Sequence, residues 1–361
     1  MGIKMVKPDY KVPLMKEVKQ IPLNNFKVAS TFSGTGGSCL GYRMAGFSVG
    51  YANEFVESAR DSYRLNHQDG FLDSRDIRNV KGSDILEKMG IAEGELDILD
   101  GSPPCVSFSM AGSREKKWGK VQKYHGRRQV ADNLFDEFCR LVNETQPKVF
   151  IAENVKGLVM GAAKGYFKLI FKALESCGYS VKARVLDGSY LGIPQKRQRV
   201  FLIGVRNDLQ LEPVFPKPFP YRYSVQECLR GIEVASKENA VWLNEASKTY
   251  KVWQGVKPGR NFSEYRMKLD GKYGYFNFIK ANKYLPSPTI VASENTFHWN
   301  EPRRLSIPEI KRIGSFPDDF LLAGSVSEQW ARIGLSVPPF MTRAVASVIQ
   351  TEILEHANSS A

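Results

Sequence analysis

The stretch that decides the fold is KVASTFSGTGG, at residues 27–37. Its first six residues, three of them apolar, read as a strand, and a helical pattern follows over residues 39–45. The glycines between them predict a tight turn, because glycine adopts backbone torsions closed to other residues and lets a ligand approach the backbone. Taken alone, such a turn is equally compatible with a simple connection between two elements.

Strands and helices continue to alternate beyond this turn. Strands are predicted at residues 48–53, 96–100, 148–152, 179–186 and 199–205, and helices at residues 56–66, 133–144 and 166–177. Repeated strand–helix units of this kind predict an α/β fold with a doubly wound, mostly parallel sheet.

The character of the chain changes after the last of these strands. Residues 213–220 read PVFPKPFP, a proline-rich linker. Residues 213–306 carry 15 Lys and Arg against 8 Asp and Glu, and 16 of the 41 aromatic residues. We expect a smaller, irregular and β-rich domain there. Helices are predicted at residues 306–313 and 340–356, and we expect the second of these to pack on the first domain.

We therefore predict a division of the chain into two domains and a hinge. The first domain would hold residues 1–212 and 319–361, the second residues 213–306, and the hinge residues 307–318.

The composition is that of a globular protein with excess positive charge. Of the 361 residues, 42% are hydrophobic and 25% charged, and the formal net charge is +13. No run of about 18 apolar residues occurs, so a helical membrane span is not expected. The charge favours an anionic partner, with nucleic acid as the first candidate, although it would also serve solubility alone.

The cysteines and the N-terminus indicate the cellular compartment. Cys39, Cys105, Cys139, Cys177 and Cys228 form no CxxC pair, which argues against disulfides or a zinc site. The four histidines form no ligand cluster, so we expect no metal. The first 25 residues lack the apolar segment of a signal peptide. We expect a cytoplasmic protein.

Acidic residues follow two successive strands. Glu54 ends the strand at residues 48–53, about 20 residues beyond the glycine turn, where a carboxylate commonly accepts hydrogen bonds from ribose. Asp76 lies near the end of a further strand. Each acid alone is compatible with a helix cap or a solvated loop. With the turn, they predict a nucleoside-bearing cofactor at the carboxyl edge of the sheet.

A cysteine lies on the loop after the strand at residues 96–100. Residues 103–109 read PPCVSFS, with Cys105 as the third residue, and residues 114–128 carry seven Lys and Arg against one Glu. A positive field favours the nucleophilic thiolate. The alternative is a buried cysteine beside a solvated basic loop.

Further charged groups follow the next strands. Glu153 comes directly after the strand at residues 148–152, and Arg197 and Arg199 stand just before the strand at residues 199–205. These groups are compatible with the same site, or with a surface acid and a charged turn.

Together these residues resemble the conserved blocks of the DNA (cytosine-5)-methyltransferases of the bacterial and phage restriction–modification type. The blocks run in the family's order from residue 28 to residue 350: Phe32 to Gly37, Glu54, Asp76, Pro104-Cys105, Glu153-Asn154-Val155, Gln195-x-Arg197-x-Arg199, Arg303 to Ser306, Gly314 to Asp318 and Gly334 to Pro339. Methyltransferases acting on exocyclic nitrogens typically carry an Asn/Asp-Pro-Pro-aromatic motif, whereas this chain has Ser-Pro-Pro-Cys.

The resemblance implies a class I, Rossmann-like methyltransferase domain and a target-recognition domain at residues 213–306. It implies methyl transfer from S-adenosylmethionine to carbon 5 of a cytosine flipped out of a specific duplex DNA sequence. By resemblance, Cys105 adds to carbon 6, Glu153 engages ring nitrogen 3 and the exocyclic amine, Arg199 reaches oxygen 2, and Arg197 helps to hold the site.

The resemblance also implies the binding residues, and it requires no metal. The cofactor contacts would be Phe32, Ser33, Gly34, Thr35, Gly36, Gly37, Glu54, Phe55, Asp76, Ile77, Pro104, Leu134, Ser336 and Val337. The DNA contacts would be Ser109, Arg114, Lys117, Arg127, Arg128, Thr289 and Arg303. We expect a monomer associated with the bacterial nucleoid, with a cognate restriction endonuclease as a functional partner.

The chain departs from the family pattern at two places, and three alternative functions stay open. Leu335 stands where many members carry Asn, and the segment before Leu134 lacks a common Arg. A tRNA cytosine-5 methyltransferase would carry a Cys-Phe-Thr insertion, which does not follow Val155. A catalytically silent DNA-binding relative would be expected to lose Cys105, Glu153 or Arg199. A nicotinamide-dependent dehydrogenase leaves Cys105 and Glu153 unexplained.

Overall fold

The computed structural model describes residues 7–104, 122–124, 127–129, 134–161, 163–232 and 235–359. The chain divides into two compact units. The sheet unit comprises Lys19–Leu186, Gln198–Lys217 and Thr342–Ala361, and the second unit comprises Met1–Val18, Asp187–Arg197 and Pro218–Met341. The domain and hinge boundaries given above stay a prediction.

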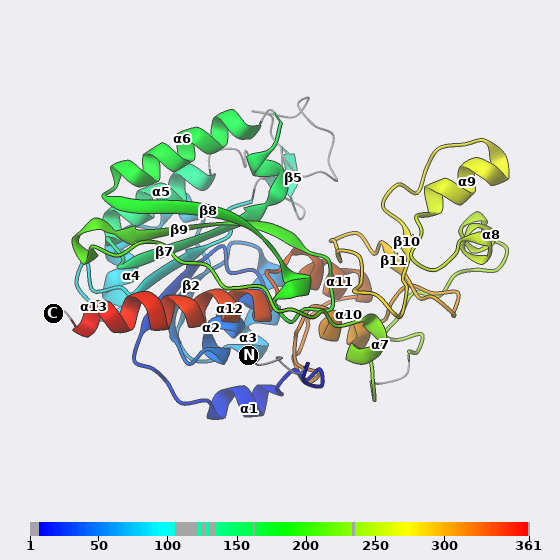
Figure 1. The fold of residues 1–361 in the computed structure, drawn as a ribbon, viewed down its shortest axis with the longest axis horizontal. Helices are drawn as coiled ribbons and strands as arrows, with labels where there is room; N and C mark the ends of the chain where they lie inside the picture. The colour runs from blue at the N-terminus through cyan, green and yellow to red at the C-terminus, as the bar shows by residue number, and fades with distance from the viewer. Residues whose placement is uncertain are drawn as a thin grey trace, which may run out of the picture. The chain divides into compact units, whose positions relative to one another are not determined.

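Seven strands form the central sheet, in the order β3-β2-β1-β4-β7-β9-β8 (Figure 1). Their bounds are β1 (Lys27–Thr31), β2 (Ser48–Asn53), β3 (Phe71–Asp73), β4 (Ile98–Gly101), β7 (Val149–Val155), β8 (Tyr179–Asp187) and β9 (Gln198–Arg206). The pairs from β3 through to β7 are parallel, and β9 runs antiparallel to β7. The predicted doubly wound, mostly parallel sheet is confirmed.

The strand register aligns the loops that carry the predicted site. Thr31 at the end of β1 pairs with Asn53 of β2 and with Gly101 of β4, and Gly101 pairs with Ala152 of β7. The carboxyl ends of β1, β2, β4 and β7 are therefore aligned, and the loops that follow them leave the sheet at the same edge. The chain winds from β1 towards β3 and later from β4 towards β8, so this edge is a topological switch point, where α/β sheets bind ligands.

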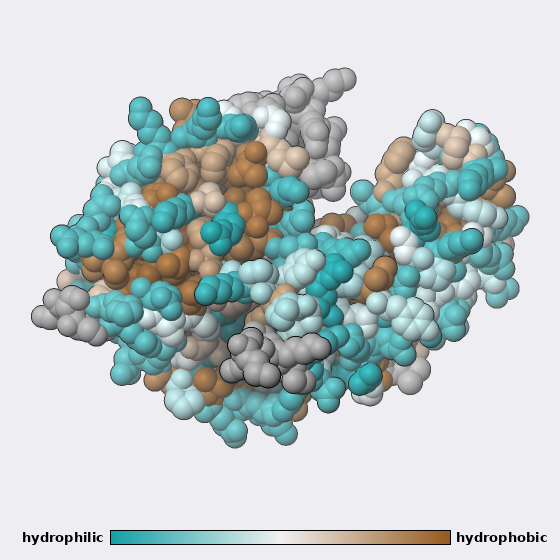
Figure 2. Space-filling model, in the orientation of Figure 1, coloured by the Kyte–Doolittle hydropathy of each residue, from teal (hydrophilic) through white to brown (hydrophobic). Residues whose placement is uncertain are grey.

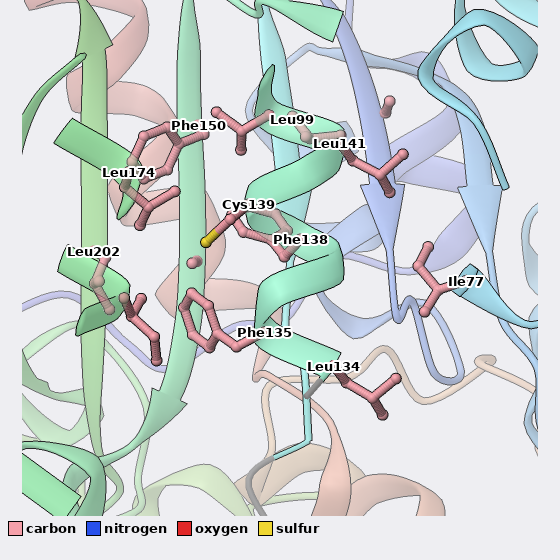
Figure 3. Packing of buried hydrophobic residues seen from close by; sticks show 14 of the residues in the cluster. Ile77, Leu99, Leu134, Phe135, Phe138, Cys139, Leu141, Phe150, Leu174 and Leu202 are labelled. Atoms are coloured by element: carbon pink, nitrogen blue, oxygen red, sulfur yellow. The ribbon is translucent and has the colours of Figure 1, made fainter. Parts of the chain in front are cut away.

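The sheet is buried on both faces by helices. Their bounds are α2 (Gly37–Met44), α3 (Glu57–Asn66), α4 (Gly82–Met89), α5 (Leu134–Thr145) and α6 (Ala163–Ser176). The strands are apolar because parallel strands covered on both faces expose little to water. On α5, buried residues recur at helical spacing, and Phe135, Phe138 and Leu141 pack with Phe150 of β7 (Figure 3).

The C-terminal helical segment is nearly continuous. Helix α12 (Pro339–Ile349) passes through a π-helical turn at Gln350–Leu354 into α13 (Glu355–Ser359). This segment matches the helix predicted over residues 340–356. No helix among the described residues is both long and apolar enough to cross a bilayer.

The edge strand β8 exposes part of its length. Val185 of β8 is 36% exposed and Leu169 of α6 is 68% exposed. Figure 2 shows hydrophobic residues gathered over this part of the sheet unit.

Two shorter strands, β5 (Gln122–Tyr124) and β6 (Arg127–Gln129), pair antiparallel in a sheet of their own.

The second unit is more helical than expected. Its elements include α7 (Val225–Cys228), α8 (Lys248–Gly255), α9 (Phe262–Asp270), β10 (Ile279–Lys280), β11 (Thr296–Phe297), α10 (Ile307–Ile313) and α11 (Val326–Leu335), and α1 (Met15–Gln20) begins in it. The expectation of a β-rich region at residues 213–306 is wrong for its described residues, because β10 and β11 have two residues each. A core of Val252, Trp253, Val256, Phe262 and Phe297 joins α8, α9 and β11.

Candidate active site

The glycine turn joins β1 to α2 and has an unusual backbone. Phe32, Gly34 and Gly36 have positive φ angles of 54°, 58° and 89°. A non-glycine residue such as Phe32 adopts this region at a cost of about 1–3 kcal/mol, and such strain is typical of functional sites. Gly36 has a further constraint, because a Cβ atom there would lie 2.2 Å from Nε2 of His67.

Glu54 holds this turn from the end of β2. Its carboxylate accepts a hydrogen bond from the backbone N–H of Gly34 at 2.8 Å and another from that of Val56 at 2.6 Å. Only 8% of Glu54 is exposed. The backbone carbonyl of the neighbouring Phe55 accepts a hydrogen bond from Arg60 at 2.6 Å. Glu54 and the turn therefore form one unit at the sheet edge.

Asp76 and Ile77 follow β3. The Asp76 carboxylate caps a short 3-10 turn by accepting a hydrogen bond from the backbone N–H of Arg78, and it also forms an ion pair with the Arg78 guanidinium at 2.9 Å. Ile77 is buried in the core cluster to which Leu134, the first residue of α5, also belongs (Figure 3).

Glu153 and Arg199 form an ion pair on adjacent strands. Their Oε1 and Nε atoms are 2.9 Å apart, and their side chains are 11% and 15% exposed. Burial lowers the pKa of Arg199, and the Glu153 charge opposes this shift. Glu153, predicted to follow the strand, lies within it: β7 continues to Val155 because β9 pairs with it along this length.

Asn154 connects β7 to the loop that carries Cys105. Its side-chain amide donates a hydrogen bond to the carbonyl of Pro103 at 2.9 Å, and the amide is buried. Pro104 is the last described residue of this loop. Cys105, Ser109, Arg114 and Lys117 lie outside the described residues, as do the side chains of Arg127 and Arg128.

Arg197 belongs to the second unit and is 2% exposed. Its guanidinium donates hydrogen bonds to three backbone carbonyls, those of Ile290 at 2.9 Å, Gly334 at 3.1 Å and Ser336 at 2.8 Å. The side-chain carbonyl of the buried Gln195 accepts a hydrogen bond from the backbone N–H of Ile290 at 3.1 Å. These contacts tie Arg197 to the segments around Ile290 and Gly334, and its predicted part in the active site stays a prediction.

Three other predicted contacts also lie in the second unit. The Thr289 hydroxyl donates a hydrogen bond to the carbonyl of Lys196 at 2.6 Å, and the buried Ser336 hydroxyl donates one to that of Arg332 at 2.8 Å. Val337 is buried, whereas Leu335, at the position of the departure from the family pattern, is 42% exposed.

Arg303, predicted to contact DNA, is 3% exposed. Its guanidinium makes two hydrogen bonds to the carboxylate of Glu309, at 2.7 and 2.9 Å, and a third to that of Glu301 at 2.5 Å. Its charge is thus balanced inside the second unit, which disfavours the predicted contact with a DNA phosphate.

Burial disfavours the thiolate form of the other four cysteines. Burial raises the pKa of Cys39 to about 11 and that of Cys139 to about 12, and it also raises the pKa values of Cys177 and Cys228. Since the thiolate is the reactive form, none of these four thiols is suited to covalent catalysis. Within the described parts of the chain, no group of three or more His, Cys, Asp and Glu side chains is arranged to hold a metal ion.

Sequence reasoning missed one polar residue at this edge. Asp100 of β4 is 3% exposed, and hydroxyl groups of Ser30, Ser38 and Tyr42 donate hydrogen bonds to it. A carboxylate inside a buried strand is a visible signal in the sequence, because such strands are otherwise apolar.

The sheet order, with a strained glycine turn after β1 and a carboxylate after β2, defines a class I methyltransferase that uses S-adenosylmethionine. The model of the C-5 cytosine-specific DNA methylase family matches residues 26–351. The chain therefore belongs to this family, whose members methylate carbon 5 of cytosine in DNA.

Characterised relatives agree with this assignment. The chain is 32% identical to the type II methyltransferase M.NgoFVII of Neisseria gonorrhoeae over 88% of this chain and 84% of that protein. It is 30% identical to the type II methyltransferase M.PspPI of a Psychrobacter strain, over 92% and 81% of the two chains.

Solved structures share the fold. One is a prophage-encoded E. coli protein described as a DNA modification methyltransferase, with a TM-score of 0.68 and 22% identity over 91% of this chain and 99% of that chain. DNMT2 of Spodoptera frugiperda has a TM-score of 0.63 and 17% identity, over 90% and 99% of the two chains. At these identities the likeness establishes the fold alone.

Proposed function

We propose that this chain methylates carbon 5 of a cytosine flipped out of a specific duplex DNA sequence, through a covalent adduct between Cys105 and carbon 6. The observation that carries the proposal is the Glu153–Arg199 ion pair of 2.9 Å. It sets an acid and a fixed cation together on β7 and β9, and Asn154 beside it holds the start of the loop that leads to Cys105. This pairing suits a base with neighbouring oxygen, ring nitrogen and amine groups.

The residues after β1 and β2 fit S-adenosylmethionine. The Thr35 hydroxyl is buried and has no hydrogen-bond partner among the described residues, so a polar donor is available within the turn. A Cβ atom at Gly34 would meet nothing within 4 Å, which leaves space beside that backbone. When bound, the cofactor supplies an electrophilic methyl group and leaves as S-adenosylhomocysteine.

We assign the cofactor contacts as predicted from the sequence. They are Phe32, Ser33, Gly34, Thr35, Gly36, Gly37, Glu54, Phe55, Asp76, Ile77, Pro104, Leu134, Ser336 and Val337. Glu54 would accept hydrogen bonds from the ribose while it holds the Gly34 amide.

On the base, the chain would act through addition and elimination. The Cys105 thiolate adds to carbon 6, and the electron pair that it pushes into the ring makes carbon 5 nucleophilic. A protonated Glu153 would donate its proton to ring nitrogen 3 as charge develops there and hold the exocyclic amine through its other oxygen, while Arg199 would donate to oxygen 2. After carbon 5 is methylated, its proton leaves, the carbon 5–carbon 6 double bond re-forms and the thiolate is expelled.

The DNA contacts proposed are Ser109, Arg114, Lys117, Arg127, Arg128 and Thr289. The cations of residues 114–128 would engage phosphates around the extruded base. We further propose that the enzyme acts as a monomer on nucleoid DNA in the cytoplasm, beside a cognate restriction endonuclease. Size-exclusion chromatography with light scattering tests the monomer.

The test is transfer of a labelled methyl group from S-adenosylmethionine to duplex DNA, with tRNA as the competing substrate. We expect label in DNA at carbon 5 of cytosine in one sequence, read by bisulfite sequencing. Cys105→Ser and Cys105→Ala should abolish transfer while duplex binding persists. Transfer by either variant would contradict the covalent route, and label in tRNA alone would support the RNA-methylating alternative.

A further inference from the structure

Asp100 is a buried acid beneath the glycine turn. The hydroxyls of Ser30 and Ser38 donate hydrogen bonds to its Oδ2 atom at 3.0 and 2.9 Å, and that of Tyr42 donates one to Oδ1 at 3.1 Å. Asp100, Ser30 and Tyr42 are each less than 4% exposed, and Ser38 is 6% exposed. The carboxylate thus collects three neutral donors from two other elements.

Burial makes this arrangement costly. Removing a carboxylate from water is unfavourable even after the protein relaxes, and here burial raises the pKa of Asp100 to about 6. The hydroxyl donors offset part of that shift. An apolar side chain at this place in the strand would avoid the unfavourable burial of a carboxylate. Asp100 therefore contributes to the local geometry rather than to stability.

The three donors lie on both sides of the cofactor turn. Ser30 is in β1, two residues before Phe32, whereas Ser38 and Tyr42 lie in α2, directly after the turn. The network also reaches into the turn, because the Ser33 hydroxyl lies 2.9 Å from the Ser30 carbonyl and 3.2 Å from its hydroxyl. One carboxylate on β4 therefore ties the entry and the exit of the turn together.

We infer that Asp100 is a positioning residue for the cofactor turn: it fixes the spacing between the end of β1 and the start of α2, and so sets the affinity for S-adenosylmethionine without touching the cofactor or the base. This rests on the proposed cofactor contacts of residues 32–37. Losing it should loosen the turn.

The test compares Asp100→Asn with a matched control, Asp97→Asn. Asp97 is 6% exposed and stands just before the opposite end of β4, where it accepts a hydrogen bond from the Lys27 backbone N–H and pairs with Lys148, each at 2.8 Å. Calorimetry would measure the Kd for S-adenosylmethionine and for S-adenosylhomocysteine. We expect Asp100→Asn to raise both about tenfold, as the loss of a charge-assisted hydrogen bond predicts.

Kinetics separate positioning from general damage. In Asp100→Asn, KM for S-adenosylmethionine should rise in parallel with Kd, while kcat at saturating cofactor and the Kd for duplex DNA stay within about twofold. Asp97→Asn should lower Tm without changing the cofactor Kd. A folded Asp100→Asn protein with wild-type cofactor Kd would overturn the inference. If the wild-type enzyme binds the cofactor but transfers no methyl group, only the proposed function fails.

If Asp100→Asn does not fold, two milder substitutions at Ser38 test the same inference. Ser38→Ala removes one donor, and Ser38→Thr keeps the hydroxyl. We expect the alanine variant to raise the cofactor Kd and the threonine variant to restore it. A wild-type Kd for Ser38→Ala would contradict the role given to the network.

Discussion

At the level of single residues, the charge balance around Glu153 and Arg199 governs what the site can do. Each side chain is largely buried, so its charge has to be balanced by that of the other while no base is bound. The ion pair fixes the two side chains relative to each other before a base binds. In the proposed mechanism the Arg199 cation donates to the carbonyl oxygen of the base.

Removing that cation should impair transfer far more than binding. We expect Arg199→Met to reduce kcat for methyl transfer about 100-fold, the usual loss for a donor that stabilises developing charge. Arg199→Lys should keep part of the activity, since it retains the charge without the planar fork. Radiolabel transfer at saturating cofactor and DNA measures both variants.

Arg184→Met provides the control for this substitution. Arg184 lies on the neighbouring strand β8, where its guanidinium stacks 4.8 Å from the ring centroid of Phe215. Wild-type transfer is expected for Arg184→Met. Equal losses for Arg184→Met and Arg199→Met would show that Arg199 has no specific role.

At the level of elements, the turn between β1 and α2 depends on two glycines in different ways. Gly34 needs only its positive φ, because a side chain there would meet open space. Gly36 combines a φ of 89° with the close approach of the His67 ring. Gly34 is thus constrained by its backbone torsion alone, whereas Gly36 is constrained also by packing against His67 at the end of α3.

The two constraints predict a graded result. Gly34→Ala should lower stability by about 1–2 kcal/mol from backbone strain alone, and Gly36→Ala should lower it further because His67 must move. Thermal and urea unfolding measure both. If Gly36→Ala were as stable as Gly34→Ala, the contact with His67 would be of no consequence.

Element boundaries were predictable where turn residues and apolar runs coincide. The strand predicted at residues 48–53 matches β2, which begins just after Gly46. Helices α8 and α9 were missed because their apolar periodicity is poor, although Ser247 and Asn261 cap their first turns and were readable signals. The length of β7 depends on pairing with β9, which follows it by more than 40 residues, so local sequence could not fix it.

The site was only partly predictable for the same reason. The blocks around Gly34, Glu54 and Glu153 carry their own sequence signals. The Asp100 network requires β1 to lie beside β4, and that neighbour relation emerges only from the sheet order. The environment of Arg303 was equally hidden, since its block carries a sequence signal but not the two acids that balance its charge within its own unit.

At the level of the whole molecule, the net charge of +13 is concentrated in two stretches. Residues 114–128 carry a net charge of +6 and residues 213–306 carry +7, so the remainder is close to neutral. Cations that neutralise phosphates release counterions, and binding then weakens steeply as salt rises.

Charge removal should therefore change the salt dependence of DNA binding. Replacing Arg127 and Arg128 by Gln should reduce the slope of log K against log salt by about 1–2, because each lost phosphate contact contributes about 0.9. Replacing Lys168 and Lys172, two exposed lysines of α6, should leave the slope unchanged. Fluorescence anisotropy over a salt series measures it, and equal slopes for the two pairs would refute the assignment of the basic loop.

The buried thiols have a practical consequence for handling the enzyme. Cys39, Cys139 and Cys228 are shielded, and their pKa values are raised, so mild electrophiles and peroxide should spare them. Damage during storage would then fall mainly on the partly exposed Cys177 and on the proposed nucleophile Cys105. Loss of activity that a reductant reverses would report the redox state of Cys105, and stoichiometric alkylation of a Cys177→Ser variant would count the competent molecules in a preparation.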